Sequence, residues 1–102
     1  MRWARLSFLS FVLVTAPVQA QEPPPPGDAA ADVAAAAEAF RKGRNLMAEE
    51  RYAEACVAFE ESQALVPGSG TLLNLGDCYE RTGRSASAWA TFRAAAALAR
   101  SR

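Results

Sequence analysis

The sequence predicts an all-α fold of repeated helical hairpins, and three observations support this prediction. When residues 36–100 are compared with themselves at an offset of about 33 residues, similar residues coincide without a gap. This offset places Gly43 on Gly76 and Phe59 on Phe92, so small residues recur as small and large apolar residues as large. A period of about 33 residues is typical of two-helix units that bury their apolar faces by stacking on a neighbour. The chain is also rich in alanine, which favours helices, and poor in β-branched residues.

Residues 1–20 have the pattern of a secretory signal peptide. Arg2 and Arg5 charge the start, an apolar run follows, and small residues lead to a predicted cleavage between Ala20 and Gln21. We therefore expect a periplasmic or secreted protein. The alternative is an uncleaved N-terminus that tethers an accessory factor to the membrane, although the apolar run is short for a bilayer span.

A proline-rich linker is predicted at residues 21–27, since Pro23–Pro26 are four consecutive prolines. Such a run cannot be helical and favours an extended polyproline II spacer. The linker is expected to separate the cleavage site from a helical domain at residues 28–102. A ligand for a proline-binding module is the alternative interpretation.

Helical spacing of apolar residues predicts four helices in this domain, at residues 29–49, 52–66, 71–81 and 86–100. The expected caps are Asp28 for the first helix, Ser69 or Thr71 for the third and Ser85 for the fourth. The expected inward-facing residues are Val33, Ala36, Ala37, Phe40, Gly43, Leu46 and Met47, then Ala55, Phe59, Ser62 and Leu65, then Leu72, Leu75, Gly76 and Tyr79, and finally Ala88, Trp89, Phe92, Ala95 and Leu98.

Gly43 in the first of these helices calls for a physical reason, because glycine destabilises a helix interior. We expect Gly43 to permit close approach of the partner helix, with Ala55 as the matching small residue on the second helix. Gly83 is expected to close the turn between the third and fourth helices.

The repeating residues resemble the signature of the tetratricopeptide repeat (TPR) family, as found in small secreted or periplasmic bacterial proteins. The second copy offers Leu75, Gly76, Tyr79, Gly83, Ala88, Phe92, Ala95 and Leu98, and the first offers Gly43, Tyr52, Ala55, Phe59, Leu65 and Pro67. The first copy departs from the family pattern at Lys42, Leu46 and Glu50. The resemblance implies two repeats, at about residues 36–68 and 69–102, stacked as a short right-handed solenoid.

In that family the first helix of each repeat lines a concave groove that holds an extended peptide or a partner's helix. By position, the resemblance implies groove residues Phe40, Arg44, Met47, Leu73, Asn74, Asp77, Glu80 and Arg81. Asn74 matches an Asn that hydrogen-bonds the ligand backbone in some members. Phe40 and Arg44 stand where members that bind a C-terminal carboxylate have Lys and Asn, so a full carboxylate clamp is not expected. For each charged residue the alternative is an exposed helix face with pairs such as Asp77 with Arg81.

The last helix presents Trp89 and Phe92 with no further repeat to cover them. Solenoids usually end in a polar capping helix and have three or more repeats. We expect this face to be covered by residues missing from an incomplete chain, by a second copy or by another protein. A structural subunit that oligomerises through this face is thus an alternative to a peptide-binding module.

Two cysteines, Cys56 and Cys78, lie 22 residues apart on helices that would be neighbours in such a stack. Disulfides persist in the oxidising compartment to which a signal peptide leads. We predict a Cys56–Cys78 disulfide, with two buried free thiols as the alternative. This spacing matches no C-x-x-C redox motif, and two thiols alone make a poor metal site.

Composition argues against an enzyme or a nucleic-acid-binding protein. The 102 residues include 11 basic and 11 acidic side chains and no histidine, the commonest general base and metal ligand. Cleavage of the signal peptide would leave nine basic groups against eleven acidic ones, a net charge of −2. The paired carboxylates at Glu49-Glu50 and Glu60-Glu61 are interpreted as solvated surface, and Gly68 and Gly70 as part of an inter-helix turn. We expect no catalytic residue, cofactor, metal, small-molecule substrate or nucleic acid, and a protein or peptide partner.

Overall fold

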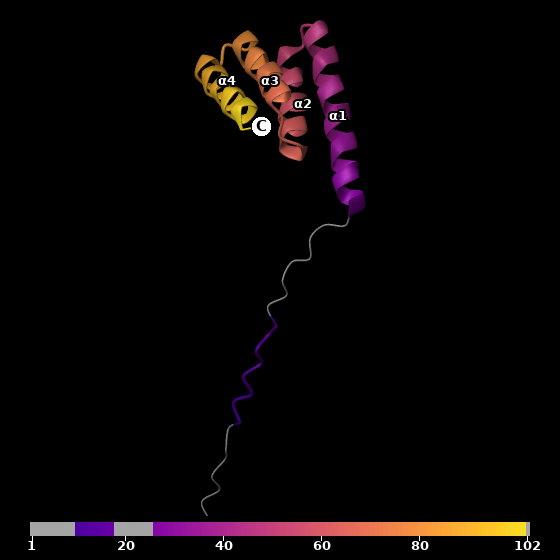
Figure 1. Ribbon diagram of the computed structural model, residues 1–102, viewed down its shortest axis with the longest axis vertical. Coiled ribbons are helices and arrows are strands. Elements are labelled where there is room, and N and C mark those ends of the chain that lie inside the picture. Colours follow the sequence, from indigo (N-terminus) through magenta and orange to yellow (C-terminus); the bar gives the residue numbers. More distant parts are fainter. Residues whose placement is uncertain (1–9, 18–25, 102) are drawn as a thin grey trace, which may run out of the picture.

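The computed structural model describes residues 10–17 and 26–101, and this described part contains four helices and no strand. Helix α1 spans Pro26–Ala48, α2 spans Tyr52–Leu65, α3 spans Ser69–Arg81 and α4 spans Ser85–Arg100 (Figure 1). The all-α prediction is confirmed. Residues 10–17 form neither helix nor strand and have exposed side chains. The other residues of the predicted signal peptide, and the linker as far as residue 25, lie outside the described residues.

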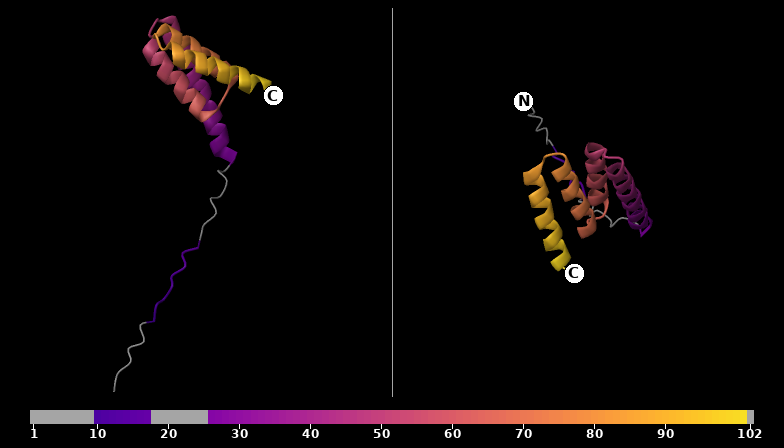
Figure 2. Two further views of the ribbon diagram at one scale, coloured as in Figure 1. Left: turned by 90° about the vertical axis from the view of Figure 1, so that its left-hand side faces the viewer. Right: turned by 90° about the horizontal axis from the view of Figure 1, so that it is seen from above.

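The helices form two antiparallel hairpins, α1 with α2 and α3 with α4, and the hairpins stack through α2 and α3. All four helices lie side by side in chain order in Figure 1 and in the right-hand view of Figure 2. Helix α1 also contacts α3, so the first helices of the two hairpins share one side of the stack. This shared side contains the candidate site described below.

Both hairpins close with the same turn, at equivalent positions of the sequence repeat. Glu50 has φ 60° and Gly83 has φ 76°, both in the left-handed region. The amide of Arg51 donates to the carbonyl of Leu46 at 2.9 Å, and the amide of Arg84 donates to that of Tyr79 at 2.8 Å. These bonds satisfy carbonyls at the helix ends, as in a Schellman motif. The prediction that Gly83 closes a turn is confirmed.

The core consists of small and aromatic side chains that fill the space within and between the hairpins. Gly43 lies against the ring of Phe59, and Gly76 lies against that of Phe92, which confirms the expected close approach of paired helices. Phe40 packs on Phe59 with ring centroids 5.7 Å apart. The buried cluster comprises Leu46, Ala55, Cys56, Ala58, Phe59, Leu75, Cys78, Tyr79 and Ala88.

A disulfide between Cys56 and Cys78 joins the two hairpins, as predicted. It links α2 to α3 with a Cα–Cα distance of 5.6 Å, within the usual range for a disulfide. Both residues are buried. Sγ of Cys78 also lies 2.9 Å from the carbonyl oxygen of Tyr52. Since a disulfide sulfur has no proton to donate, this is a packing contact rather than a hydrogen bond.

Polar side chains complete the contact between α2 and α3. The Tyr79 hydroxyl donates to Glu60 at 2.8 Å, and Arg84 lies 3.8 Å from the same carboxylate and over the Tyr79 ring. Burial raises the pKa of the Tyr79 phenol above 10.0, and the hydrogen bond to Glu60 raises it further. The α2–α3 interface thus combines a covalent link with a charge-assisted hydrogen bond.

Helix boundaries differ from the prediction chiefly at the N-termini. Helix α1 begins at Pro26 rather than Ala29, because proline is well suited to the first turn of a helix. Asp28 therefore lies inside the first turn and is not the cap. Helices α3 and α4 begin at Ser69 and Ser85, after Gly68 and Arg84 as N-cap residues without side-chain hydrogen bonds.

The predicted serine and threonine caps are therefore wrong. The amide of Arg84 is already bonded to the preceding turn, and its carbonyl accepts from Ala88 at 2.9 Å. The chain thus enters α4 directly from the left-handed turn with Arg84 as the N-cap residue. Ser85 is already the first residue of the helix and does not cap it.

Three of the residues predicted to face inward are exposed. Val33 is 58% exposed, Trp89 is 64% exposed, and Ala37 is also at the surface. Val33 and Ala37 border a hollow beside α3, where no side chain covers them. Trp89 lies on a part of α4 that no other described helix covers. The other predicted inward residues are all buried or half-buried, including Gly43, Gly76 and Leu65.

Candidate functional site

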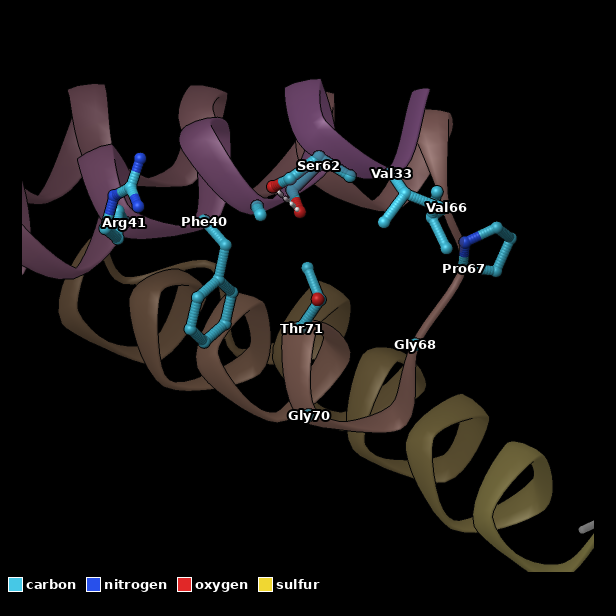
Figure 3. Close-up of a pocket in the computed structure, with 11 residues that line it drawn as sticks. Val33, Phe40, Arg41, Ser62, Val66, Pro67, Gly68, Gly70 and Thr71 are labelled. Carbon is cyan, nitrogen blue, oxygen red and sulfur yellow. Dashed lines mark hydrogen bonds between the residues drawn. The ribbon is translucent and has the colours of Figure 1, made fainter. Parts of the chain in front are cut away.

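The side of the stack shared by α1 and α3 contains an apolar hollow of about 560 Å³. Phe40 on α1 points toward α3, and Thr71 on α3 points back toward α1, with Val33 further along the same wall (Figure 3). A volume of this size is within the range of about 300–1,000 Å³ usual for ligand sites. The lining residues are Val33, Ala36, Ala37, Phe40, Arg41, Ser62, Val66, Pro67, Gly68, Gly70 and Thr71.

The turn between α2 and α3 makes room for this hollow. Pro67 and Gly68 end the first hairpin, and Gly70 lies in the first turn of α3, where an added β-carbon would meet nothing within 4 Å. The buried Ser62 hydroxyl donates to the carbonyl of Ala36 at 2.8 Å, so this polar group in the wall is satisfied (Figure 3). The hollow therefore offers mainly apolar contact.

A second, polar hollow of about 370 Å³ lies between the other ends of α1 and α3. Its two sides are bridged by Arg44, whose Nη1 donates to Oδ1 of Asn74 at 3.3 Å. Asn74 also donates through Nδ2 to the carbonyl of Gly70 at 2.9 Å, which fixes its amide. The lining residues are Arg44, Met47, Ala48, Tyr52, Asn74, Asp77 and Arg81.

Arg81 is held in place by two neighbours in the polar hollow. Its Nε lies 3.6 Å from Asp77, and its Nη1 donates to the Tyr52 hydroxyl at 3.4 Å. The guanidinium carbon also lies 5.6 Å from the centre of the Tyr52 ring. Exposed ion pairs contribute little to stability, so these contacts matter mainly because they orient the guanidinium. Arg44 and Arg81 thus present two oriented cations beside one carboxylate.

Six of the eight predicted groove residues line these hollows. Phe40 lies in the apolar one, and Arg44, Met47, Asn74, Asp77 and Arg81 lie in the polar one. The structure does not bring Leu73 or Glu80 into either hollow. Leu73 is 53% exposed and Glu80 is also exposed, because both residues lie toward the side of α3 that no further helix covers among the described residues.

Sequence reasoning missed several residues of the walls, in particular Tyr52, Val66 and Thr71. Each lies at or beside the end of a helix, where the inter-helix turn carries it into the groove. The Pro67-Gly68-Ser69-Gly70 turn was the available signal, because a turn rich in small residues leaves space beside the next helix.

One carboxylate of each pair in the sequence, Glu49 and Glu60, has a structural partner. Glu49 contacts Arg51, which also pairs with Glu54, and these bonds raise the pKa of the Arg51 guanidinium. Glu60 contacts Tyr79 and Arg84. In the part of the chain that the structure describes, no three His, Cys, Asp or Glu side chains cluster closely enough to hold a metal ion.

Trp89 and Phe92, the residues predicted to form an oligomer face, are placed differently. Phe92 is half-buried against Gly76 within the second hairpin. Trp89 is exposed, and the guanidinium carbon of Arg93 lies 4.7 Å from the centre of its ring.

Comparisons with known proteins do not assign the chain to a family, since no protein-family model, curated protein or solved structure matches it. Among the residues described, no helix is both long enough and apolar enough to cross a membrane.

Proposed function

We propose that this chain is a non-enzymatic protein-interaction domain of two TPR-type hairpins that binds an extended peptide along the groove between α1 and α3. The observation that carries this proposal is that an apolar hollow and a polar hollow lie in line between these two helices. The Arg44–Asn74 hydrogen bond joins the two walls of the groove.

The TPR-type assignment is supported by equivalence of contacts as well as of residues. The contact of Gly43 with Phe59 recurs in the second hairpin as that of Gly76 with Phe92. The left-handed residue of the first hairpin, Glu50, likewise recurs as Gly83. Two hairpins that repeat both features share one backbone plan, as repeat proteins do.

The groove chemistry favours a peptide with an apolar side chain at one end and an acidic one at the other. Arg41, Arg44 and Arg81 border the two hollows, whereas Asp77 is the one acidic residue that lines them. A guanidinium binds carboxylates through two parallel hydrogen bonds. Arg44 is the best candidate, because Arg81 is already paired with Asp77.

The compartment proposed is the periplasm or the secretory route. The Cys56–Cys78 disulfide favours an oxidising environment. Mass spectrometry of the protein isolated from cells tests the leader. A mature N-terminus at Gln21 would support secretion, whereas retention of Met1 would favour the membrane-tethered alternative.

Selection from a displayed library of random peptides, followed by titration of the selected peptides, tests the binding function. Selected peptides should combine an apolar residue with one or more acidic residues. Ala37→Glu places a carboxylate in the apolar hollow, and Arg44→Glu reverses a charge in the polar one. Each should weaken binding by at least about tenfold, equivalent to about 1.4 kcal/mol.

Arg100→Glu at the end of α4 is the matched control, because it makes the same charge reversal at an exposed position outside the groove. It should leave the affinity unchanged. Circular dichroism of all three variants verifies that they fold. Failure to select any peptide, or selected peptides that bind both groove variants as tightly as the wild type, would contradict the proposal.

A further inference from the structure

The exposed face of α4 corresponds, residue by residue, to the face of α2 that binds α3. Helix α2 contacts α3 and the turns beside it through Tyr52, Cys56, Glu60 and Gln63. At the equivalent positions of the second repeat, α4 carries Ser85, Trp89, Arg93 and Ala96. These counterparts form a surface on α4 that nothing covers among the described residues, with Trp89 64% exposed at its centre.

The charge on this surface is inverted between the two copies. Glu60 on α2 accepts from Tyr79 and attracts Arg84. Its counterpart on α4 is Arg93, which stacks on the Trp89 ring. A helix that lay on α4 as α3 lies on α2 would therefore need acidic groups where α3 has Tyr79 and Arg84.

A second copy of the chain stacked head to tail does not meet this requirement. Helix α1 would then occupy the place of α3, with Asn45 opposite Trp89 and Leu46 opposite Arg93. Arg51, the counterpart of Arg84, would lie opposite Arg93 and is already paired with Glu49 and Glu54, so the ion pair between Arg84 and Glu60 would have no equivalent. The outer face of α1 also carries Lys42, in place of the buried Leu75 of α3.

Two copies joined symmetrically through α4 do not supply the required acidic groups either. The sequence of α4, SASAWATFRAAAALAR, contains two arginines and no acidic residue. A pair of these helices would bring cations together without a carboxylate to compensate them. Like charges brought together at an interface disfavour association.

We propose that the Trp89/Arg93 face of α4 binds an amphipathic helix of a partner protein, with an apolar residue against Trp89 and acidic residues against Arg93. The face is separate from the α1–α3 groove and does not depend on the peptide-binding proposal. Trp89 supplies the large apolar contact typical of binding hot spots. Arg93 supplies orientation, because a guanidinium pairs with a carboxylate in a defined geometry.

A peptide based on α3 provides the probe, since α3 shows how a helix sits on the equivalent face. The acidic probe is residues 68–84 with Cys78→Leu, Tyr79→Glu and Arg84→Glu. The control probe carries Cys78→Leu alone and keeps Tyr79 and Arg84. Binding is followed by fluorescence of the full chain with Trp3→Phe, which leaves Trp89 as its single tryptophan.

The acidic probe should change the Trp89 emission saturably and bind at least about tenfold more tightly than the control probe. Arg93→Glu should reverse this preference. Arg44→Glu, in the separate groove, should leave it unaltered, so failure of one proposal is distinguishable from failure of the other. Binding of Trp89→Ala is measured by isothermal calorimetry, and it should be weakened for both probes.

Three outcomes would overturn the proposal. The first is no saturable binding of the acidic probe, or equal binding of both probes. The second is a concentration-dependent dimer in sedimentation that Trp89→Ala abolishes, since a second copy would then cover the face. The third is a shift of Trp89 emission with phosphatidylglycerol vesicles but not with the acidic probe, which would make the face a lipid-binding surface.

Discussion

The ring of Phe59 lies so close to Gly43 that a β-carbon on Gly43 would be 2.6 Å from Cε1 of the ring. Phe59 is fully buried, so the ring has little freedom to move away. Gly76 and Phe92 repeat the arrangement, with 2.5 Å between the added β-carbon and the ring. The absence of a side chain at these two glycines therefore sets how closely the helices of each hairpin pack.

Gly43→Ala is expected to destabilise the protein by about 1–3 kcal/mol, the usual cost of overpacking a core. Gly76→Ala should cost less, because Phe92 is only half-buried and can shift toward solvent. The measurement is the free energy of unfolding in urea, followed by circular dichroism.

Gly70→Ala is the control for this prediction. It places the same methyl group in a helix where nothing lies within 4 Å, so it should be neutral or stabilising by up to about 1 kcal/mol. If Gly43→Ala were as stable as the wild type, Phe59 would have to move aside at no cost, and the packing argument would be wrong.

These contacts illustrate what could be predicted from sequence. The repeat equates Gly43 with Gly76 and Phe59 with Phe92, and a glycine inside a helix already implies close packing. The exposure of Val33 was not predictable in this way. Helical spacing places Val33 on the inner face of α1, but it cannot show that the Pro67–Gly70 turn leaves that part of the face uncovered.

The candidate groove was predictable in position but not in detail. The family resemblance located six of the lining residues, yet the hydrogen bond between Arg44 and Asn74 joins residues 30 positions apart. The geometry of this hydrogen bond depends on how α1 and α3 cross. That crossing is set by the packing of α2 against both helices. The placement of Leu73 in the groove was wrong for a related reason. In the structure Leu73 lies on a side of α3 that no described helix covers.

Glu50 and Gly83, the two residues with a left-handed turn conformation, predict substitutions with opposite effects on stability. Glu50 has φ 60°, a conformation that costs a residue with a side chain about 1–2 kcal/mol, while glycine adopts it freely. Glu50→Gly should therefore stabilise the protein by about 1 kcal/mol. Gly83→Ala, at the equivalent turn with φ 76°, should destabilise it by a similar amount. Urea unfolding compares both variants with the wild type.

Glu61→Gly makes the same substitution at an exposed position inside α2, where glycine weakens the helix by about 1 kcal/mol. It should thus change stability in the direction opposite to Glu50→Gly. Equal destabilisation by both substitutions would mean that the strain at Glu50 is negligible.

The disulfide should stabilise the fold mainly by restricting the unfolded chain. Closing a loop over a sequence separation of 22 residues contributes about 3 kcal/mol by the chain-entropy relation. The Cys56→Ala/Cys78→Ala double variant should lose about this amount in urea unfolding. Alanine avoids placing an unsatisfied polar group at two buried positions.

Reductant provides the control for the disulfide. It should lower the stability of the wild type toward that of the double variant and leave the double variant unchanged. A double variant as stable as the oxidised wild type would show that α2 and α3 are held together without the covalent link.

Tyr79 should make stability depend on pH in the alkaline range. Burial and the hydrogen bond to Glu60 raise its pKa above 10.0 in the folded protein, although Arg84 acts in the opposite direction. The unfolded chain therefore loses this proton at a lower pH than the folded protein does. The stabilisation is fully present below pH 10.0 and is lost as the pH rises through the higher, folded pKa.

Tyr79→Phe removes the hydroxyl and keeps the ring, so it isolates this effect from other alkaline titrations. At neutral pH the variant should be less stable than the wild type by about 1 kcal/mol, the usual worth of such a hydrogen bond. The difference in unfolding free energy should shrink as the pH is raised above 10.0, because ionised Tyr79 would be repelled by Glu60. A difference that stays constant across this range would mean that the phenol ionises as readily in the fold as in water, and that its contact with Glu60 does not hold α3 to α2.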